Sequence, residues 1–166
     1  MLFRSVAALA AYQDAVVRSA HLDPSLTEMV RLRCARQHDC RICQTLRLGD
    51  AIAAGVDDAA TAKIDHYESS DLPERTKVAL RIVDAFIWKP TSIDSELARQ
   101  AHENFSDAEL AELLVDITKW STQKIHVALG TDGADHLPVD GSGVAYLSFR
   151  SDGSAAVTGS LRVSAS

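Results

Sequence analysis

The chain has 166 residues, of which 46% are apolar and 24% charged, and its formal net charge is −6 at pH 7. This composition fits one globular domain with a sizeable core and excludes a disordered or membrane-embedded chain. No run of Lys and Arg interrupts the acidic balance, so non-specific nucleic-acid binding is disfavoured.

The first residues do not have the pattern of a targeting segment. The apolar stretch from Val6 to Ala11 ends at Tyr12 and Gln13, before it reaches signal-peptide length. No stretch approaches the roughly 20 apolar residues that a membrane-spanning helix needs. Three cysteines, two of them in a CxxC motif, fit a reducing compartment. We therefore expect a cytoplasmic protein that does not bind a membrane.

Apolar spacing predicts helices along most of the chain. Asp23 before Pro24, Gly55, and the pair Ser106 and Glu109 are typical start and stop signals. The expected helices are an amphipathic N-terminal one through Leu2, Val6, Leu9 and Val16, then Pro24 to Gln37, Cys40 to Gly55, Asp57 to Ile64, Asp71 to Trp88, Asp94 to His102 and Asp107 to Leu129.

The last residues differ in character from this helical part. Strand-forming residues run from Val144 to Phe149 and from Ala155 to Val163, around an Asp-Gly turn signal at Asp152. A C-terminal β-hairpin is expected, and a disordered Ser/Gly/Ala tail is the alternative. We thus expect a helical domain over residues 1–130 and an extension over residues 131–166.

Cys40 and Cys43 are the residues with the clearest chemical signature. Three positions apart at the start of a predicted helix, their sulfur atoms lie near one helix face and within reach of a disulfide. The helix N-terminus favours the thiolate, and Arg41 and Arg47 add positive charge nearby. Because the thiolate is the nucleophilic form, the motif predicts a reactive dithiol.

Other interpretations of the cysteines remain open at this point. A zinc site needs four ligands, and beyond the CxxC only the distant His66, His126 and His136 could supply more. The two cysteines could also be reduced core residues, as we expect for Cys34. Trp88 and Trp120 are interpreted as packing or interface anchors. We predict no metal, and no nucleotide, haem or flavin signature indicates a bound cofactor.

The run from Glu28 to Ala35, followed by Cys40-Arg41-Ile42-Cys43, resembles the AhpD-like alkylhydroperoxidase branch of the carboxymuconolactone decarboxylase superfamily. In that pattern a glutamate precedes the CxxC by twelve residues, which is the spacing from Glu28 to Cys40. The run from Gly49 to Asp57 and the segment from Phe105 to Leu110 are also similar, so the resemblance covers residues 20–130. It implies an all-α domain of about six to seven helices.

The resemblance also implies a thiol-dependent peroxidase or dithiol oxidoreductase. In the family mechanism the residue matching Cys43 attacks a hydroperoxide and the residue matching Cys40 resolves the sulfenic acid, whereas the helix dipole favours Cys40 as the more acidic thiol. The implied partners are a small hydroperoxide or other electrophile, a thiol or protein reductant, and further copies of the chain in a homo-oligomer.

One position departs from the family pattern. Four residues after Cys43, where the family commonly has a proton-relay histidine, the chain has Arg47, which does not release its proton near neutral pH. Arg47 could instead hold Glu28 as an ion pair or stabilise a Cys43 thiolate. His38 is the best substitute proton carrier, with a solvent-facing loop residue as the alternative.

Two rival functions follow from this departure. The first is a non-catalytic helical oligomer whose CxxC is a redox sensor or a structural clip, which Arg47 favours. The second is small-molecule chemistry like that of the decarboxylase branch, which generally lacks this CxxC.

Overall fold

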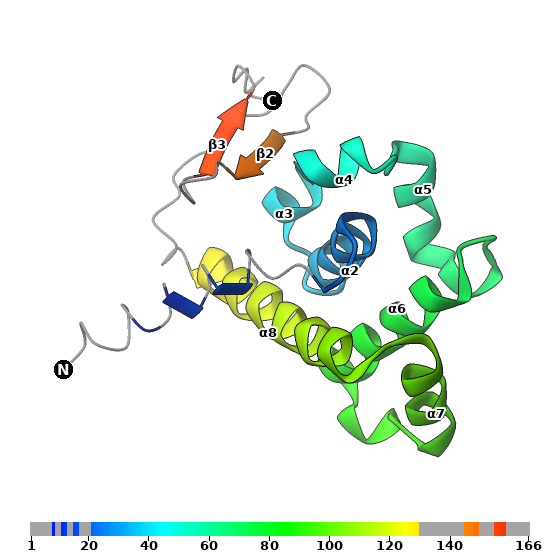
Figure 1. The fold of residues 1–166 in the computed structure, drawn as a ribbon. Helices are drawn as coiled ribbons and strands as arrows, with labels where there is room; N and C mark the ends of the chain where they lie inside the picture. The colour runs from blue at the N-terminus through cyan, green and yellow to red at the C-terminus, as the bar shows by residue number, and fades with distance from the viewer. Residues whose placement is uncertain are drawn as a thin grey trace.

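The computed structural model describes residues 8, 11–12, 15–16 and 21–129 and the strands at 145–149 and 155–158. The described elements are α2 (Pro24–Gln37), α3 (Arg41–Thr45), β1 (Leu46–Leu48), α4 (Gly49–Ala53), α5 (Asp58–Ala62), η1 (Lys63–Ser69), α6 (Glu74–Trp88), η2 (Pro90–Ser92), α7 (Ser95–Asn104), α8 (Asp107–Leu129), β2 (Ala145–Phe149) and β3 (Ala155–Thr158). The fold is predominantly helical, as predicted (Figure 1).

Helix α2 lies at the centre of the molecule, with α8 on one side and α3 to α6 around the other (Figure 1). It begins where Asp23 accepts a hydrogen bond from the amide of Leu26 at 2.9 Å, with Pro24 in the first turn. Val30 packs in a core with α6, α7 and α8, whereas Leu32 packs in a second core with α4, η1 and α6. Because both of its faces are covered, α2 is the scaffold on which the site is built.

The bounds of the long helices agree well with the sequence prediction. Helices α2 and α8 span the predicted residues, and α6 begins at Glu74, three residues after the predicted start. Of the predicted N-terminal helix, residues 8, 11–12 and 15–16 are helical, and its other residues lie outside the described part. None of the helices among the described residues combines the length and the apolar character that a membrane-spanning segment requires.

The single helix predicted from Cys40 to Gly55 is wrong. The segment forms α3, β1 and α4, because Leu46 and Leu48 have extended backbone angles, with ψ values of 144° and 127°. The cause lies in the tertiary structure: Arg31 of α2 donates a hydrogen bond to the Leu46 carbonyl at 2.6 Å, and the Leu48 amide donates one to Glu28 at 3.4 Å. These buried polar groups hold the chain extended where its local sequence favours a helix.

The helix predicted from Asp57 to Ile64 is also divided. Asp57 does cap a helix, by accepting from the amide of Ala60 at 2.7 Å, but α5 then gives way to η1, which is kinked at His66.

The C-terminal strands agree with the predicted hairpin. Strands β2 and β3 pair in antiparallel fashion, with Leu147 opposite Val157, and β1 pairs in parallel with β2, with Leu46 opposite Ala145. The predicted turn at residues 151–154 lies outside the described residues, and so does the predicted second strand beyond Thr158. The division into a domain and an extension stays a prediction.

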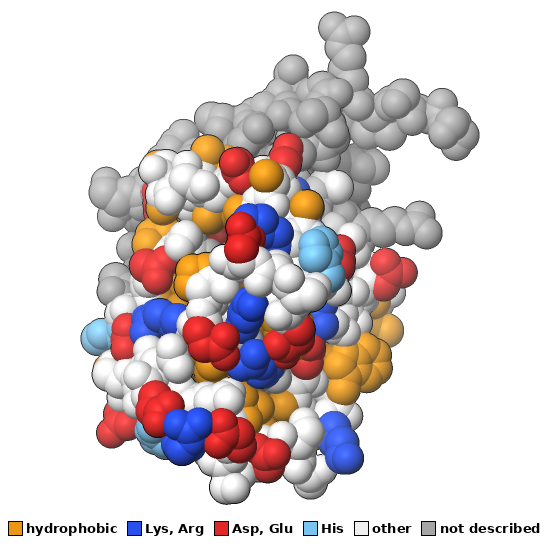
Figure 2. Space-filling view, turned by 90° about the vertical axis from the view of Figure 1, so that its right-hand side faces the viewer, with side chains coloured by type: hydrophobic (Ala, Val, Ile, Leu, Met, Phe, Trp, Pro, Cys, Tyr) orange, Lys and Arg blue, Asp and Glu red, His pale blue; other side chains and the backbone are white. Residues whose placement is uncertain are grey.

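Acidic and basic side chains are mixed on the face that Figure 2 shows. Ion pairs join Arg81 to Glu68 and Glu74, and Arg99 to Glu96, each at 2.6 Å. Because opposite charges alternate there, the described residues on this face form no basic patch of the kind that nucleic-acid backbones require.

Candidate active site at the CxxC motif

Cys40 and Cys43 form a disulfide at the start of α3, with their Cα atoms 5.3 Å apart. Cys40 is the N-cap residue of this short helix, and its sulfur accepts a hydrogen bond from the Cys43 amide at 3.4 Å. Both cysteines are buried. The predicted pairing geometry is therefore present, and the amide contact favours negative charge on the Cys40 sulfur in the reduced pair.

A tight turn brings the motif back onto α2. Asp39 has a φ of 47°, in the left-handed region, and it is exposed. The Cys40 amide then donates to the Ala35 carbonyl at 2.9 Å. Asp and Asn adopt this backbone conformation more readily than most residues, so the His38-Asp39 sequence is suited to the turn.

Glu28 and Arg31 form a buried ion pair beneath the disulfide. The guanidinium contacts both carboxylate oxygens, from Nε to Oε2 and from Nη2 to Oε1, each at 2.7 Å. Glu28 is fully buried and Arg31 is 3% exposed. Such bidentate pairs are among the strongest hydrogen-bonded contacts in proteins.

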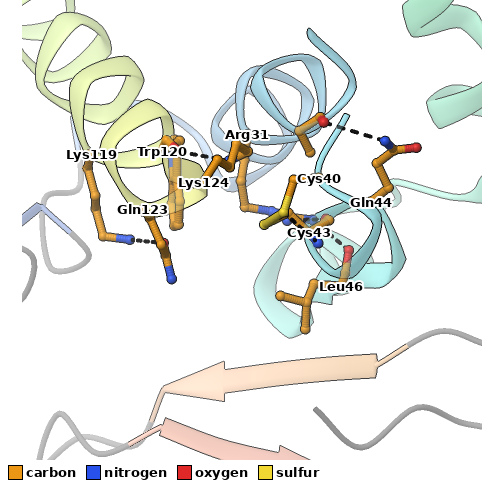
Figure 3. Close-up of a disulfide and its surroundings, with 10 residues drawn as sticks. Arg31, Cys40, Cys43, Gln44, Leu46, Lys119, Trp120, Gln123 and Lys124 are labelled. Atoms are coloured by element: carbon orange, nitrogen blue, oxygen red, sulfur yellow. Dashed lines mark hydrogen bonds between the residues drawn. A yellow bond between two sulfur atoms is a disulfide. The ribbon is translucent and has the colours of Figure 1, made fainter. Parts of the chain in front are cut away.

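Arg31 also links α2 to the motif. Its Nη1 donates to the Cys43 carbonyl at 2.9 Å and its Nη2 to the Leu46 carbonyl at 2.6 Å, as Figure 3 shows for the labelled residues. Sequence reasoning gave Arg31 no role. The sequence signal for this role is that Arg31 follows Glu28 by three residues, a spacing that puts both side chains on the same helix face.

Arg47 does not hold Glu28, so that hypothesis is wrong. Its Nη1 donates to the carbonyls of Gln44 at 2.6 Å and Leu46 at 2.9 Å, and its ion pair is with Asp58 at 3.9 Å. Arg31 occupies the place that Arg47 was expected to take. Burial lowers the pKa of Arg47, an effect that the charge of Glu28 partly opposes.

His38 lies in the turn between α2 and Cys40. It is half-buried, and its Nε2 atom is buried without a hydrogen-bond partner among the described residues. Burial, with a contribution from the charge of Lys124, lowers the pKa of His38. The lowered pKa favours the neutral ring, which can accept a proton but is a weaker base than a free histidine.

Cys34 is buried and unpaired, as expected for a core residue. Burial raises the pKa of its thiol to about 12, so the thiolate is scarce at neutral pH.

In Figure 3, Trp120 and Lys124 of α8 lie next to Arg31, whereas Lys119 and Gln123 lie on the side of Trp120 away from the disulfide. Trp120 packs in the core that contains Val30, as predicted, whereas Trp88 is 67% exposed. Nothing in the helical pattern of α8 marks Lys119 and Lys124 as buried, so the sequence offers no signal for them.

A zinc site is not found among the residues that the structure describes. No group of three or more His, Cys, Asp or Glu side chains that could hold a metal occurs among the described residues. His66 lies in η1, and the side chains of His126 and His136 lie outside the described part.

Comparison with known proteins gives relatives without an assigned function. No model of a known protein family matches the chain. An uncharacterized protein of Mycobacterium tuberculosis, found in two strains, is 40% identical over 129 residues, which are 77% of this chain. The chain spans 45% of the length of these relatives.

A solved structure has a similar fold. It is the crystal structure of a protein of unknown function from Agrobacterium tumefaciens, described as a candidate antioxidant defence protein AhpD. The TM-score is 0.61, with 19% identity over 82% of this chain and 91% of that one. The chain therefore has an AhpD-like helical fold.

Proposed function

We propose that this chain is a thiol-dependent peroxidase or dithiol oxidoreductase that uses Cys40 and Cys43 to reduce hydroperoxides. The observation that carries the proposal is a disulfide at the N-terminus of α3 within an AhpD-like fold. The buried Glu28–Arg31 pair supports it, because it fixes the carbonyls of Cys43 and Leu46 around the motif.

The reaction cycle starts from the reduced pair. The Cys43 thiolate attacks the terminal oxygen of the hydroperoxide, an S–O bond forms, the O–O bond breaks, and the alkoxide leaves with a proton as an alcohol. The Cys40 thiol then attacks the sulfenic sulfur, and water leaves as the disulfide forms. An external dithiol reduces this disulfide by two thiol exchanges and becomes oxidised itself.

His38 is the group that we propose to carry the proton. Arg47 cannot release one near neutral pH, whereas His38 lies two residues before Cys40 and its buried Nε2 has no partner in the described part of the chain. Glu28 and Arg31 act together as positioning residues, and Arg47 ties the end of α3 to β1 through its carbonyl contacts.

The proposed partners are a small organic hydroperoxide or other electrophile and a thiol or protein reductant. A symmetric homo-oligomer and a cytoplasmic location complete the proposal, as the family resemblance implies.

The test is turnover of an organic hydroperoxide with a dithiol reductant, measured for wild type, Cys40→Ser, Cys43→Ser and Arg47→His. We expect wild-type turnover that either serine substitution reduces at least about 100-fold, since each removes one half of the dithiol. Cys34→Ser is the matched control and should retain activity, because Cys34 lies outside the pair.

Two outcomes would overturn the proposal. Reversible oxidation without wild-type turnover, with activity appearing in Arg47→His, would indicate a redox sensor on a scaffold that has lost its relay. Activity that survives both serine substitutions would indicate decarboxylase-like chemistry.

The two cysteines are distinguished by trapping the sulfenic acid with dimedone and locating the adduct by mass spectrometry. An adduct at Cys43 in Cys40→Ser is expected if Cys43 attacks the peroxide. An adduct at Cys40 in Cys43→Ser, without the first, would assign the attack to the N-cap cysteine.

A further inference from the structure

A cavity lies between α8 and the N-terminal residues that pack on it. The Tyr12 hydroxyl donates to the Val115 carbonyl at 2.8 Å, which holds these N-terminal residues against α8. The cavity has a volume of about 350 Å³, and its walls are mostly alanine and valine side chains from both segments, among them Val16 and Ala111. Its size and its apolar walls are typical of a site for a small organic molecule.

Two carboxyl groups of α8 also line this cavity. Asp116 is 2% and Glu112 is 7% exposed, whereas the lining residues Ala15, Ala108 and Ala111 are exposed. The carboxyl groups therefore lie at the buried end of the cavity, and its apolar walls lead to solvent. A space of this kind suits a ligand that has one polar end and an apolar body.

Asp116 lacks a partner in this cavity. Its Oδ2 atom is buried and accepts no hydrogen bond from any residue that the structure describes. The nearest donors are engaged elsewhere, since Tyr12 donates to a backbone carbonyl of α8 and the Lys119 Nζ atom lies 3.3 Å from the centroid of the Trp120 ring. Buried carboxyl groups are normally hydrogen-bonded or paired with a cation, so this side chain indicates a ligand that supplies the donor.

The charges at the buried end of the cavity favour a cationic ligand. Glu112 accepts hydrogen bonds from the amides of His21 and Leu22, which fix its carboxylate in place. Burial, with the charge of Glu112, raises the pKa of Asp116 to about 7, although Lys119 opposes the shift. This is the behaviour of a carboxyl group without a counter-ion. An ammonium group would supply both the missing donor and the missing positive charge.

We propose that this cavity binds a small primary amine, with the ammonium group on the Asp116 carboxylate and the apolar chain against the alanine and valine side chains. None of the residues that line the cavity belongs to the CxxC motif or to the Glu28–Arg31 pair. The inference is therefore independent of the proposed peroxidase function, and a failure of one leaves the other in place.

Binding is measured by isothermal titration calorimetry with the full chain in its disulfide form. The probes are pentylammonium chloride and pentan-1-ol, which differ mainly in charge. Near pH 8, pentylammonium should bind in a saturable way and at least about tenfold more tightly than pentan-1-ol, because only the amine forms an ion pair with Asp116. Equal affinities, or no saturable binding of pentylammonium, would overturn the proposal, and this comparison needs no variant to fold.

The role of the carboxylate is tested by Asp116→Asn, which removes the charge and keeps the shape of the side chain. It should weaken pentylammonium binding at least about tenfold and leave pentan-1-ol binding nearly unchanged. Asp50→Asn, on an exposed residue outside the cavity, is the control for net charge and should bind pentylammonium normally. Pentylammonium binding that withstands Asp116→Asn would also overturn the proposal.

The pH dependence of the affinity is a further readout. Below about pH 7 the ammonium group must displace the Asp116 proton, so wild type should bind pentylammonium about tenfold more tightly near pH 8 than near pH 6. The other titratable groups that face Asp116 or line the cavity are Glu112, Lys119, Tyr12 and His21. All four are present in Asp116→Asn, for which the affinity should be nearly constant over this range. A pH dependence of equal size in Asp116→Asn would come from one of these four groups and would overturn the ion pair with Asp116.

Discussion

At the scale of single residues, the Glu28–Arg31 pair determines the local structure of the site. Arg31 uses its guanidinium for three acceptors at once: the Glu28 carboxylate and the carbonyls of Cys43 and Leu46. A lysine would offer a point charge with no fork of donors and could not make this set of contacts. The pair thus couples the position of α2 to the backbone that follows Cys40.

This coupling predicts the effect of removing one partner. Arg31→Met leaves the Glu28 carboxylate buried without a counter-ion, and should lower the free energy of unfolding by about 3–5 kcal/mol. The double variant Glu28→Gln/Arg31→Met removes both charges and should be less destabilised than Arg31→Met alone. Urea unfolding of the two single variants and the double variant gives the coupling energy.

Arg99 and Glu96 provide the matched control, because they have the same spacing on α7 but are exposed. Arg99→Met should leave the urea midpoint nearly unchanged, since solvent screens such a pair. The coupling of Glu28 and Arg31 would be contradicted if the double variant lost as much free energy of unfolding as the two single variants lose together.

At the scale of elements, α8 is distinctive because ionisable side chains occupy its buried face. Glu112 accepts hydrogen bonds from the amides of His21 and Leu22, at 2.7 and 3.2 Å. Asp116, one turn later, is buried, and its Oδ2 atom has no hydrogen-bond partner within the part of the chain that the structure describes. Burial, with the charge of Glu112, raises the pKa of Asp116 to about 7, while Lys119 opposes the shift. The helix therefore holds a carboxyl group that is destabilising when it is ionised.

This raised pKa predicts that Asp116→Asn increases the free energy of unfolding by an amount that depends on pH. The folded protein binds the Asp116 proton more tightly than the unfolded chain, whose pKa is near 3.8, so the contribution of this proton to stability is complete below about pH 4 and is lost as pH rises through about 7. Asp116→Asn should match wild type near pH 4 and exceed it by about 1–3 kcal/mol near pH 8.

The measurement is urea unfolding at several pH values between about 4 and 8, with Asp50→Asn as the control on an exposed residue. The groups that face Asp116 are Glu112, Lys119 and the Tyr12 hydroxyl, and they are present in both proteins. If Asp116→Asn raised the free energy of unfolding equally near pH 4 and near pH 8, the protonation of Asp116 would not be the cause of the stabilisation.

At the scale of the whole molecule, Cys34 reports on global unfolding. It is fully buried in the core that joins α2, α6, α7 and α8, and its pKa is raised to about 12.

After reduction of the disulfide, Cys40 and Cys43 should react with iodoacetamide first. Cys34 should react only when the whole core opens, with a urea dependence equal to that of global unfolding. Mass spectrometry of the labelled peptides follows each cysteine; labelling of Cys34 that is fast and independent of urea would show a local opening at α2.

The helical class and the position of the CxxC follow from the amino-acid sequence. The Asp23-Pro24 start of α2 and the Ser106–Glu109 capping box of α8 are local signals, and local signals are sufficient for long amphipathic helices. The pairing of Cys40 with Cys43 was likewise predictable, because three residues of one helical turn set their separation.

The arrangement around the motif depends on contacts between elements that are distant in the sequence. The local sequence from Cys40 to Gly55 favours one helix, but contacts with Arg31 and Glu28 hold Leu46 to Leu48 extended. The packing of α2, α3 and α8 decides which arginine pairs with Glu28. It also buries Lys119 and Lys124. Spacing along one chain specifies which side chains share a helix face, but only packing specifies which charges from different helices are brought together and removed from water.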